Sequence, residues 1–267
     1  MRTIAHISDV HFGRADPLVV EGLLSDLAEL QPSLVVVSGD LTQRARRRQF
    51  AAARAFLGRI EAPLLAVPGN HDIPLFDLPR RILSPFGRYR AAICSELEPL
   101  FRDDELAVLG LNSSRPYVWR SGRLSPAQAA DVRRRLASLP PEAFRVVVTH
   151  HPFLPPPHGA DGQGIAGGLR ALRAAQDAGV DLLLAGHLHL SYSADVRSHH
   201  RPLRRSMLSV QAGTLSTRTR TEVNGYNWVV VDPPRLTLAV RAWTGSSFAP
   251  TGAARYVKRH DEWEVQD

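Results

Sequence analysis

The sequence repeatedly ends a strand-like apolar run in a short cluster of acidic, asparagine or histidine residues. The clusters are Asp9-Val-His11, Gly39-Asp40, Gly69-Asn70-His71-Asp72, His150-His151 and Gly186-His187-Leu188-His189. Four of them follow the run directly, and the third follows after a single proline. Ligands of open α/β sheets bind beyond the carboxyl ends of the strands. The pattern therefore favours a sheet that gathers these clusters at one edge.

Apolar periodicity predicts alternating strands and helices in the first part of the chain. The β-branched run at 34–37 is typical of a strand that is buried on both faces. Strands at 3–8, 34–37 and 64–67 with helices at 18–30 and 49–60 predict a parallel sheet with right-handed crossovers.

The rest of the chain continues this pattern and then becomes β-rich. Ser125-Pro126 has the residues of a helix start, with serine as the N-cap and proline at the first helical position. Four prolines predict short helices and loops over 74–103. Further strands are expected at 106–111, 146–148, 181–185, 207–212, 228–231 and 236–243, with a helix at 169–178.

No linker clearly divides the chain, and the clusters extend from Asp9 to His189. We therefore expect a catalytic domain over 1–245 and a C-terminal tail or small cap over 246–267. The proline- and glycine-rich stretch at 152–168 is expected to form a mobile loop near the site.

Composition limits the cellular setting and the partners. The chain has 267 residues and a net charge of +7, and Lys258 is its only lysine. This arginine bias favours a compositional origin of the charge over a nucleic-acid or membrane surface, and Arg44 to Arg48 are expected on a solvated helix face. No apolar run is long enough to span a membrane, no signal peptide is expected, and the single cysteine, Cys94, fits the cytoplasm.

The side chains of the clusters are those of a metal site. Seven of them could converge on two ions, and an eighth could act as an acid. Oxygen and nitrogen ligands without cysteine suit Mn, Fe, Zn or Co, and we favour Mn or Fe. Asp-x-His alone could cap a strand end and Gly-Asp alone could form a turn, but five clusters in this order favour metal binding.

The set of motifs resembles the calcineurin-like metallophosphoesterase superfamily. The resemblance implies an α/β fold, a four-layer α/β/β/α sandwich of two mixed sheets flanked by helices. It also implies that Asp9, His11 and His189 hold one metal, that Asn70, His150 and His187 hold the second, and that Asp40 bridges them. His151 remains a rival to His150 as the ligand.

The resemblance further implies that His71 is a catalytic histidine that binds no metal. Asp72 could orient the ring of His71 or could cap the following turn. The chain looks most like the bacterial class III cyclic-nucleotide phosphodiesterases and the related glycerophosphodiesterases, through Ile7 to Phe12, Thr149 to Pro152 and Gln211 to Asn227. Gln43-Arg44-Ala45 stands where a Ser/Thr protein phosphatase would carry Asp-Arg-Gly.

We therefore predict a phosphodiesterase that hydrolyses small phosphodiesters by in-line attack of a metal-bound hydroxide, with 3′,5′-cyclic nucleotides and glycerophosphodiesters as the candidate substrates. A phosphomonoesterase, a nuclease and a non-enzymatic scaffold are the alternatives, and a homodimer is left open. Arg218 and Arg220 could contact a phosphate or lie on a solvated face. His158, His199 and His200 are expected at the surface.

Overall fold

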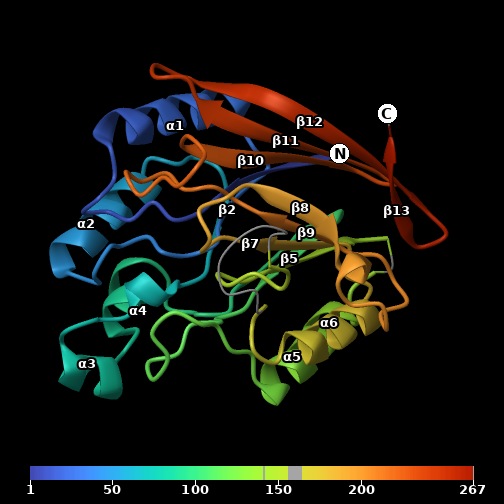
Figure 1. The fold of residues 1–267 in the computed structure, drawn as a ribbon, viewed down its shortest axis with the longest axis horizontal. Coiled ribbons are helices and arrows are strands. Elements are labelled where there is room, and N and C mark those ends of the chain that lie inside the picture. Colours follow the sequence, from blue (N-terminus) through green and yellow to red (C-terminus); the bar gives the residue numbers. More distant parts are fainter. Residues whose placement is uncertain (141, 156–163, 267) are drawn as a thin grey trace.

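Two mixed β-sheets lie at the centre of the computed structural model, which describes residues 1–140, 142–155 and 164–266 (Figure 1). The strand orders are β13-β12-β11-β10-β1-β2-β3 in the first sheet and β4-β5-β6-β7-β9-β8 in the second. The first sheet is built from β1 (Arg2–Ile7), β2 (Leu34–Val37), β3 (Leu64–Ala66), β10 (Gly225–Asp232), β11 (Arg235–Trp243), β12 (Phe248–Arg259) and β13 (Glu262–Gln266). The second is built from β4 (Leu100–Arg102), β5 (Leu106–Gly110), β6 (Phe144–Val148), β7 (Leu182–Ala185), β8 (Tyr192–Asp195) and β9 (Leu208–Gln211).

Both faces of the central strands are buried, because alternate side chains of a strand point to opposite sides of its sheet. In β2, Leu34 and Val36 belong to the apolar core that joins the two sheets. The intervening Val35 and Val37 pack in a separate apolar core with the helices on the outer face. This explains why the predicted strand at 34–37 is a continuous apolar run.

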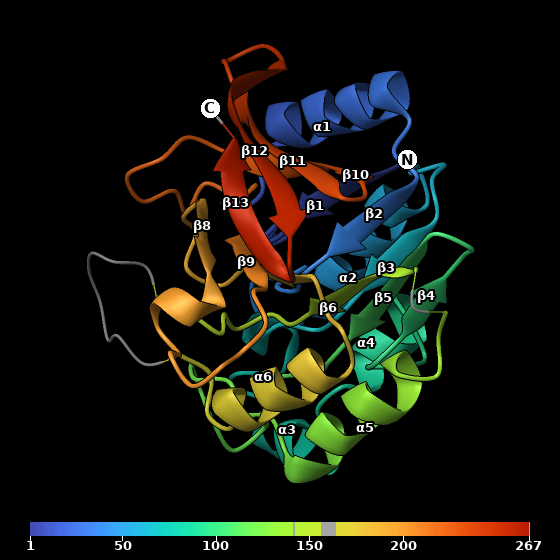
Figure 2. The same cartoon turned by 90° about the vertical axis from the view of Figure 1, so that its right-hand side faces the viewer.

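Helices cover the outer face of each sheet (Figure 2). The first sheet is covered by α1 (Pro17–Leu30) and α2 (Arg47–Leu57), and the second by α5 (Pro126–Leu136) and α6 (Gly168–Asp177). The remaining helices are α3 (Leu78–Leu83), α4 (Gly87–Ala92) and the 3₁₀ turns at Asn70–Asp72 and Val196–Ser198. The predicted α/β/β/α sandwich is confirmed.

Helix starts follow the local sequence. The side chain of Asp16 accepts a hydrogen bond from the Leu18 backbone N–H, and Pro17 occupies the first position of α1. The predicted start at Ser125-Pro126 is confirmed, because the Ser125 hydroxyl accepts from the Gln128 N–H and the Gln128 side chain accepts from the Ser125 N–H. No helix in the described part of the chain is both long and apolar enough to cross a membrane.

The C-terminal residues differ from the expected tail. β12 pairs antiparallel with β11, and β13 pairs antiparallel with β12, so both strands extend the first sheet at its edge. The turn between them places His260 and Asp261 at positive φ and lacks the usual Asn-Gly or Asp-Gly signal. Half of the residues of β12 are exposed, four of them in a row at 250–253, so the strand lacks the apolar alternation that marks a strand in the sequence. The short strands β4 and β8 were also not predicted.

The parallel strands direct their carboxyl ends toward the same region. β1, β2 and β3 are parallel neighbours in the first sheet, and β5, β6, β7 and β9 are parallel neighbours in the second. The predicted loop at 152–168 follows β6, and residues 156–163, with His158, lie outside the described residues.

Candidate metal centre

The structure brings all seven predicted metal ligands together. Asp9, Asp40 and Asn70 follow β1, β2 and β3 of the first sheet, whereas His150 and His187 follow β6 and β7 of the second. His11 and His189 lie two residues after Asp9 and His187. The centre therefore lies where the carboxyl ends of the two sheets meet, as the strand-end pattern predicted.

The ligand-bearing loops have an unusual backbone conformation. Positive φ values occur at five of the predicted ligands: Asp9 (54°), His11 (50°), Asp40 (53°), His187 (75°) and His189 (57°). This left-handed region is uncommon for residues other than glycine, and it clusters at functional sites because the surrounding structure must hold it. The conformation turns the side chains that follow each strand toward the same point.

Two glycines let the ligand loops approach one another. A Cβ at Gly69 would lie 2.0 Å from Asp40 Oδ1, and a Cβ at Gly186 would lie 1.8 Å from Ser8 Oγ and 2.6 Å from Asp9 Oδ2. These separations are far below van der Waals contact. Glycine is therefore required at both positions for the carboxylates to keep their places.

The first group of ligands is Asp9, His11 and His189. His189 Nε2 lies 3.1 Å from Asp9 Oδ1 and 3.2 Å from His11 Nε2, and His11 Nε2 lies 3.4 Å from the same carboxylate oxygen. His189 Nδ1 lies 2.8 Å from the Arg218 carbonyl oxygen, so this nitrogen must donate, and Nε2 of the neutral ring carries the lone pair. A lone pair that faces a carboxylate oxygen requires a proton or a metal cation between them.

Burial and hydrogen bonds at Asp9 agree with a cation site. Asp9 Oδ1 is buried and has no hydrogen-bond donor among the described residues, whereas Oδ2 accepts from Ser8 Oγ at 2.6 Å and His187 N at 2.8 Å. Burial raises the pKa of Asp9, but the charge of His189 and the close contacts of the His11 and His189 rings with the carboxylate lower it further, so the pKa lies well below its ordinary value. The carboxylate is therefore ionised, with one free oxygen directed into the group.

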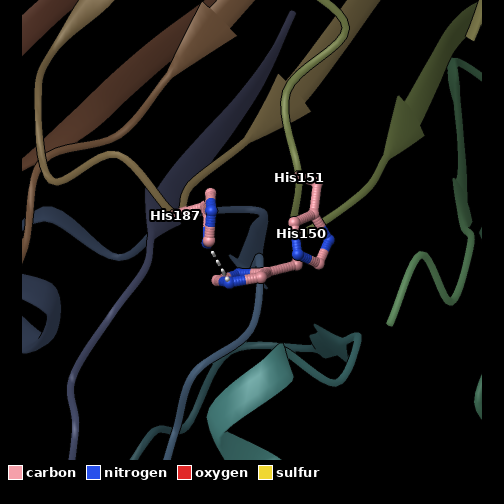
Figure 3. A group of neighbouring side chains, drawn as sticks. All are labelled: His150, His151 and His187. Atoms are coloured by element: carbon pink, nitrogen blue, oxygen red, sulfur yellow. Dashed lines mark hydrogen bonds between the residues drawn. The ribbon is translucent and has the colours of Figure 1, made fainter. Parts of the chain in front are cut away.

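The second group is Asn70, His150 and His187. His150 Nε2 lies 3.1 Å from Asn70 Oδ1 and 3.3 Å from His187 Nδ1, and Figure 3 shows the contact between the two rings. His150 Nδ1 lies 2.8 Å from the Ser38 carbonyl oxygen, which again leaves Nε2 as the lone pair of the neutral ring. Burial and the charge of His150 lower the pKa of His187 to about 3, so His187 is neutral and available as a ligand.

Asp40 lies between the two groups. Its Oδ2 is 3.4 Å from His150 Nε2 and 3.7 Å from His11 Nε2, and its Oδ1 accepts a hydrogen bond from the His71 backbone N–H at 2.8 Å. Burial lowers the pKa of His150, but the charge and hydrogen bond of Asp40 raise it further, to about 9. In the metal-free protein a proton on His150 thus balances the charge that a cation would supply.

His151 has different partners from His150. Its Nδ1 lies 2.8 Å from Ser113 Oγ, and its Nε2 lies 2.9 Å from the Arg120 carbonyl oxygen. The rings of His151 and His187 are close, with centroids 4.5 Å apart, yet both nitrogens of His151 have hydrogen-bond partners. The contacts therefore favour His150 as the ligand, the choice made from the sequence.

His71 lines the cavity beside the ligands. Its Nδ1 lies 2.8 Å from the Gln43 carbonyl oxygen and therefore donates, and its Nε2 lies 3.3 Å from Arg218 Nη1. Burial lowers the pKa of His71, although the charge of Asp40 opposes that effect. The unprotonated Nε2 of the neutral ring is the atom that faces the cavity.

The contacts of Asp72 match neither of its two predicted roles, because its partners are the loop at 41–42 and the preceding Gly69 rather than the ring of His71 or the following turn. Its carboxylate accepts hydrogen bonds from Leu41 N (3.2 Å), Thr42 N (2.8 Å), Thr42 Oγ1 (3.0 Å) and Gly69 N (3.0 Å). The ring of His71 bonds instead to Gln43. Asp72 thus joins the loop of Asp40 to the loop of Asn70, and it positions ligands without touching the cavity.

The centre opens into a cavity of about 530 Å³. One part of the wall is apolar, with Ile73, Leu75 and Trp119, and another carries Arg44 and Arg218. Arg218 Nη1 lies 3.2 Å from His11 Nε2, so this arginine is at the centre, which was one of its two predicted positions.

Arg44 and Trp119 are lining residues that the sequence did not identify. Arg44 does not lie on a solvated helix face, because it precedes α2 and its Nη1 lies 3.1 Å from His71 Nδ1. Its position only four residues after Asp40, in the same loop, was the one signal in the sequence. Trp119 had none, because it reaches the cavity from a loop far from every ligand motif.

Comparisons with known proteins agree with this geometry. A model of the calcineurin-like phosphoesterase family matches residues 2–191. The chain is 40% identical over 84 residues to the glycerophosphodiester phosphodiesterase GpdQ of Enterobacter lignolyticus. This match covers 26% of this chain and only 29% of that protein. It is also 26% identical over 203 residues to a protein of Synechococcus sp. named probable cyclic nucleotide phosphodiesterase. This second match covers 71% of this chain and 74% of the Synechococcus protein.

Solved structures show the same fold. A dimetal phosphatase from Danio rerio superposes with a TM-score of 0.67 at 14% identity, over 93% of this chain and 98% of that one. The purple acid phosphatase PPD1 of yellow lupin (Lupinus luteus) has a TM-score of 0.66 at 14% identity, over 93% of this chain and 52% of that one. Because the family model spans most of the chain, the chain belongs to the calcineurin-like phosphoesterase family, as its motifs predicted, and to the metal-dependent hydrolases by class.

Proposed function

We propose that the chain hydrolyses small phosphodiesters with two divalent metal ions, for which Mn and Fe are the favoured identities. The observation that carries this proposal is the position of Asp40, whose single oxygen Oδ2 faces His11 of the first group and His150 of the second. A carboxylate between two sets of lone pairs fits a bridging ligand. Asp9, His11 and His189 would hold one ion, and Asn70, His150 and His187 the other.

The bound ions would lower the pKa of a coordinated water and neutralise charge on the phosphate oxygens. The side chains of the protein then have separate tasks. Arg218 and Arg44 extend into the cavity, where guanidinium groups bind phosphate oxygens through charge-assisted hydrogen bonds. His71 Nε2 faces the same space, and the ring can donate a proton from Nε2 to the leaving oxygen once this nitrogen has itself been protonated. Asp72 is a positioning residue that keeps the loops of Asp40 and Asn70 together.

The cavity favours a diester over a monoester. The apolar wall of Ile73, Leu75 and Trp119 can accept an uncharged ester group, while the arginine wall accepts the charged phosphate. The names of the two sequence relatives support the same choice, since both are phosphodiesterases. We propose a cytoplasmic location on the basis of the single cysteine. The seven ligands lie within 1–245, which we retain as the proposed catalytic domain, with β12 and β13 extending its sheet.

The test is a kinetic comparison on protein reconstituted with Mn²⁺. The substrates are bis-p-nitrophenyl phosphate, p-nitrophenyl phosphate and 3′,5′-cAMP, and metal content is measured in the same samples. Asp40→Ala should abolish metal-dependent cleavage, whereas Asp104→Ala, at an exposed carboxylate, should not. Cleavage of the diesters supports the proposal. Preference for the monoester would make the chain a phosphomonoesterase, and full activity of Asp40→Ala would refute the metal centre.

A further inference from the structure

A second cavity adjoins the metal centre. It has a volume of about 460 Å³ and shares Gln43, Arg44 and Arg218 with the cavity that contains the proposed ligands. The two cavities are therefore neighbours, and Arg44 and Arg218 belong to the wall between them. We call the second one the arginine groove, because five arginines line it and no carboxylate of the described residues does: Arg14, Arg44, Arg46, Arg48 and Arg218.

The cations of the arginine groove lack ionic partners. Within residues 1–140, 142–155 and 164–266, none of the five makes an ion pair, whereas Arg241 pairs with Asp26 at 2.6 Å and Arg205 with Asp181 at 3.1 Å. Like charges that converge without a counter-charge repel one another, and a bound anion removes this repulsion. A solvated helix face would explain Arg46 and Arg48 alone, but it would not bring Arg14 and Arg218 to the same groove.

The groove is held by backbone contacts of its two sides. Gln49 Oε1 accepts from the backbone N–H groups of Arg44 (2.9 Å) and Arg46 (3.2 Å), which fixes the segment before α2. On the other side, Thr217 donates to the Arg14 carbonyl oxygen through its backbone N–H (2.8 Å) and its hydroxyl (3.0 Å). The arginines therefore extend from segments whose spacing is set before any ligand binds, and preorganisation favours binding.

We propose that the arginine groove binds a second phosphate group of the substrate, so that the preferred substrate is a phosphodiester with another phosphate close to the scissile one. This inference rests on the proposed phosphodiesterase activity. Arg218 and Arg44 contact both hollows and lie between the two phosphates, while Arg14, Arg46 and Arg48 bind the second. A nucleotide that carries a 3′-phosphate beside a 5′-phosphodiester has this chemistry, and so does the end of an oligonucleotide.

A matched pair of substrates tests the groove directly. Thymidine 5′-(p-nitrophenyl phosphate) and its 3′-phosphorylated counterpart have the same scissile bond and leaving group, and they differ only in the second phosphate. We expect kcat/KM to be about tenfold higher for the 3′-phosphorylated compound, the effect of one charge-assisted hydrogen bond. Arg46→Gln combined with Arg48→Gln should bring the ratio of the two kcat/KM values close to one.

The matched control is Arg47→Gln combined with Arg54→Gln. Both residues are exposed on α2 but do not line the groove, and the double variant removes the same total charge. It should keep the wild-type ratio. If the control reduces the ratio as much as the groove variant does, the preference comes from net charge and the proposal is overturned. Equal kcat/KM values for both substrates in the wild type overturn it as well.

A binding measurement separates failure of the groove from failure of the proposed activity. Calorimetry on the wild type and both double variants would compare thymidine 3′,5′-bisphosphate with thymidine 5′-monophosphate. If neither ester is hydrolysed with Mn²⁺, the phosphodiesterase proposal fails. The arginine groove is still supported in that case if the wild type binds the bisphosphate more tightly than the monophosphate and only the groove variant loses this difference. If the wild type binds the bisphosphate no more tightly than the monophosphate, the second anion site is overturned. A preference only for an oligonucleotide with a 3′-terminal phosphate would identify a nucleic-acid end as the source of the second phosphate.

Discussion

Replacement of Gly186 by alanine should disturb the first ligand group without removing any ligand. The new Cβ would lie 1.8 Å from Ser8 Oγ and 2.6 Å from Asp9 Oδ2. Because the two Oδ2 hydrogen bonds from Ser8 Oγ and His187 N hold Asp9 in place, a shift of Ser8 releases the carboxylate that should bind metal.

The size of the effect follows from the contacts that are lost. One hydrogen bond to a charged group contributes roughly 1.5–3 kcal/mol, and an extra methyl in a packed site costs roughly 1–3 kcal/mol. We therefore expect Gly186→Ala to lower the free energy of unfolding of the metal-free protein by about 2.5–6 kcal/mol. Loss of support behind a ligand typically weakens metal binding about 10- to 100-fold, which we expect for the first ion.

Urea unfolding of metal-free protein and titration with Mn²⁺ measure the two effects. Gly252→Ala in β12 is the control, because a Cβ at this position would have no atom within 4 Å and the φ of Gly252 is not in the left-handed region. The reasoning is refuted if Gly186→Ala unfolds within about 1 kcal/mol of the control, the scale of an ordinary surface substitution, and binds two Mn²⁺ ions with wild-type affinity.

Three further predictions concern other parts of the molecule. Asp26→Ala should lower the free energy of unfolding by about 3–5 kcal/mol in denaturant titrations, because Asp26 accepts from Arg241 Nε (2.7 Å) and Nη2 (2.6 Å) in a nearly buried pair; an unchanged midpoint would contradict this. His71→Ala should reduce kcat by roughly 10²–10⁴-fold with two metals retained, and normal turnover would remove His71 from the chemistry. Because the pKa of His150 is raised from 6.5 to about 9, its contribution to the stability of the metal-free protein is fully present below pH 6.5 and is lost as the pH rises through about 9. Metal affinity should change in the opposite direction, because the proton on His150 must leave before a metal can bind there, so the affinity should rise about tenfold per pH unit below that pKa. A pH-independent affinity would contradict the assignment of His150 as a ligand.

Much of the fold could be predicted because the central strands are buried on both faces. The run at 34–37 became β2 without change, and the helices that cover it follow from their apolar spacing. The edge strand β12 could not be predicted in the same way, since its exposed side chains carry no alternation. Apolar patterning in the sequence marks strands that are buried, so strands at the exposed edge of a sheet are difficult to predict from it.

The ligands of the site could be predicted from short motifs, but the surroundings of its other side chains could not. The ligand clusters are local signals at strand ends, and the structure brought all seven residues together. The environments of His151 and Arg44 depend on residues far along the chain: His151 bonds to Ser113 and Arg120, and Arg44 approaches His71. A run of arginines before a helix is typical of a solvated face, and only the arrangement of the neighbouring loops turns Arg44 toward the cavity.

The position of the centre also couples metal binding to the packing of the two sheets. Asp9, Asp40 and Asn70 come from the first sheet, whereas His150 and His187 come from the second, so neither sheet alone provides a complete site. The apolar core that contains Val36 and Val146 holds these halves at the spacing that lets Asp40 face both groups. A ligand that binds only the native arrangement stabilises it, by about 2.7 kcal/mol for each site at a hundredfold excess over Kd. Metal occupancy and the docking of the sheets should therefore strengthen each other, and the inter-sheet core contributes to affinity although none of its side chains is a ligand.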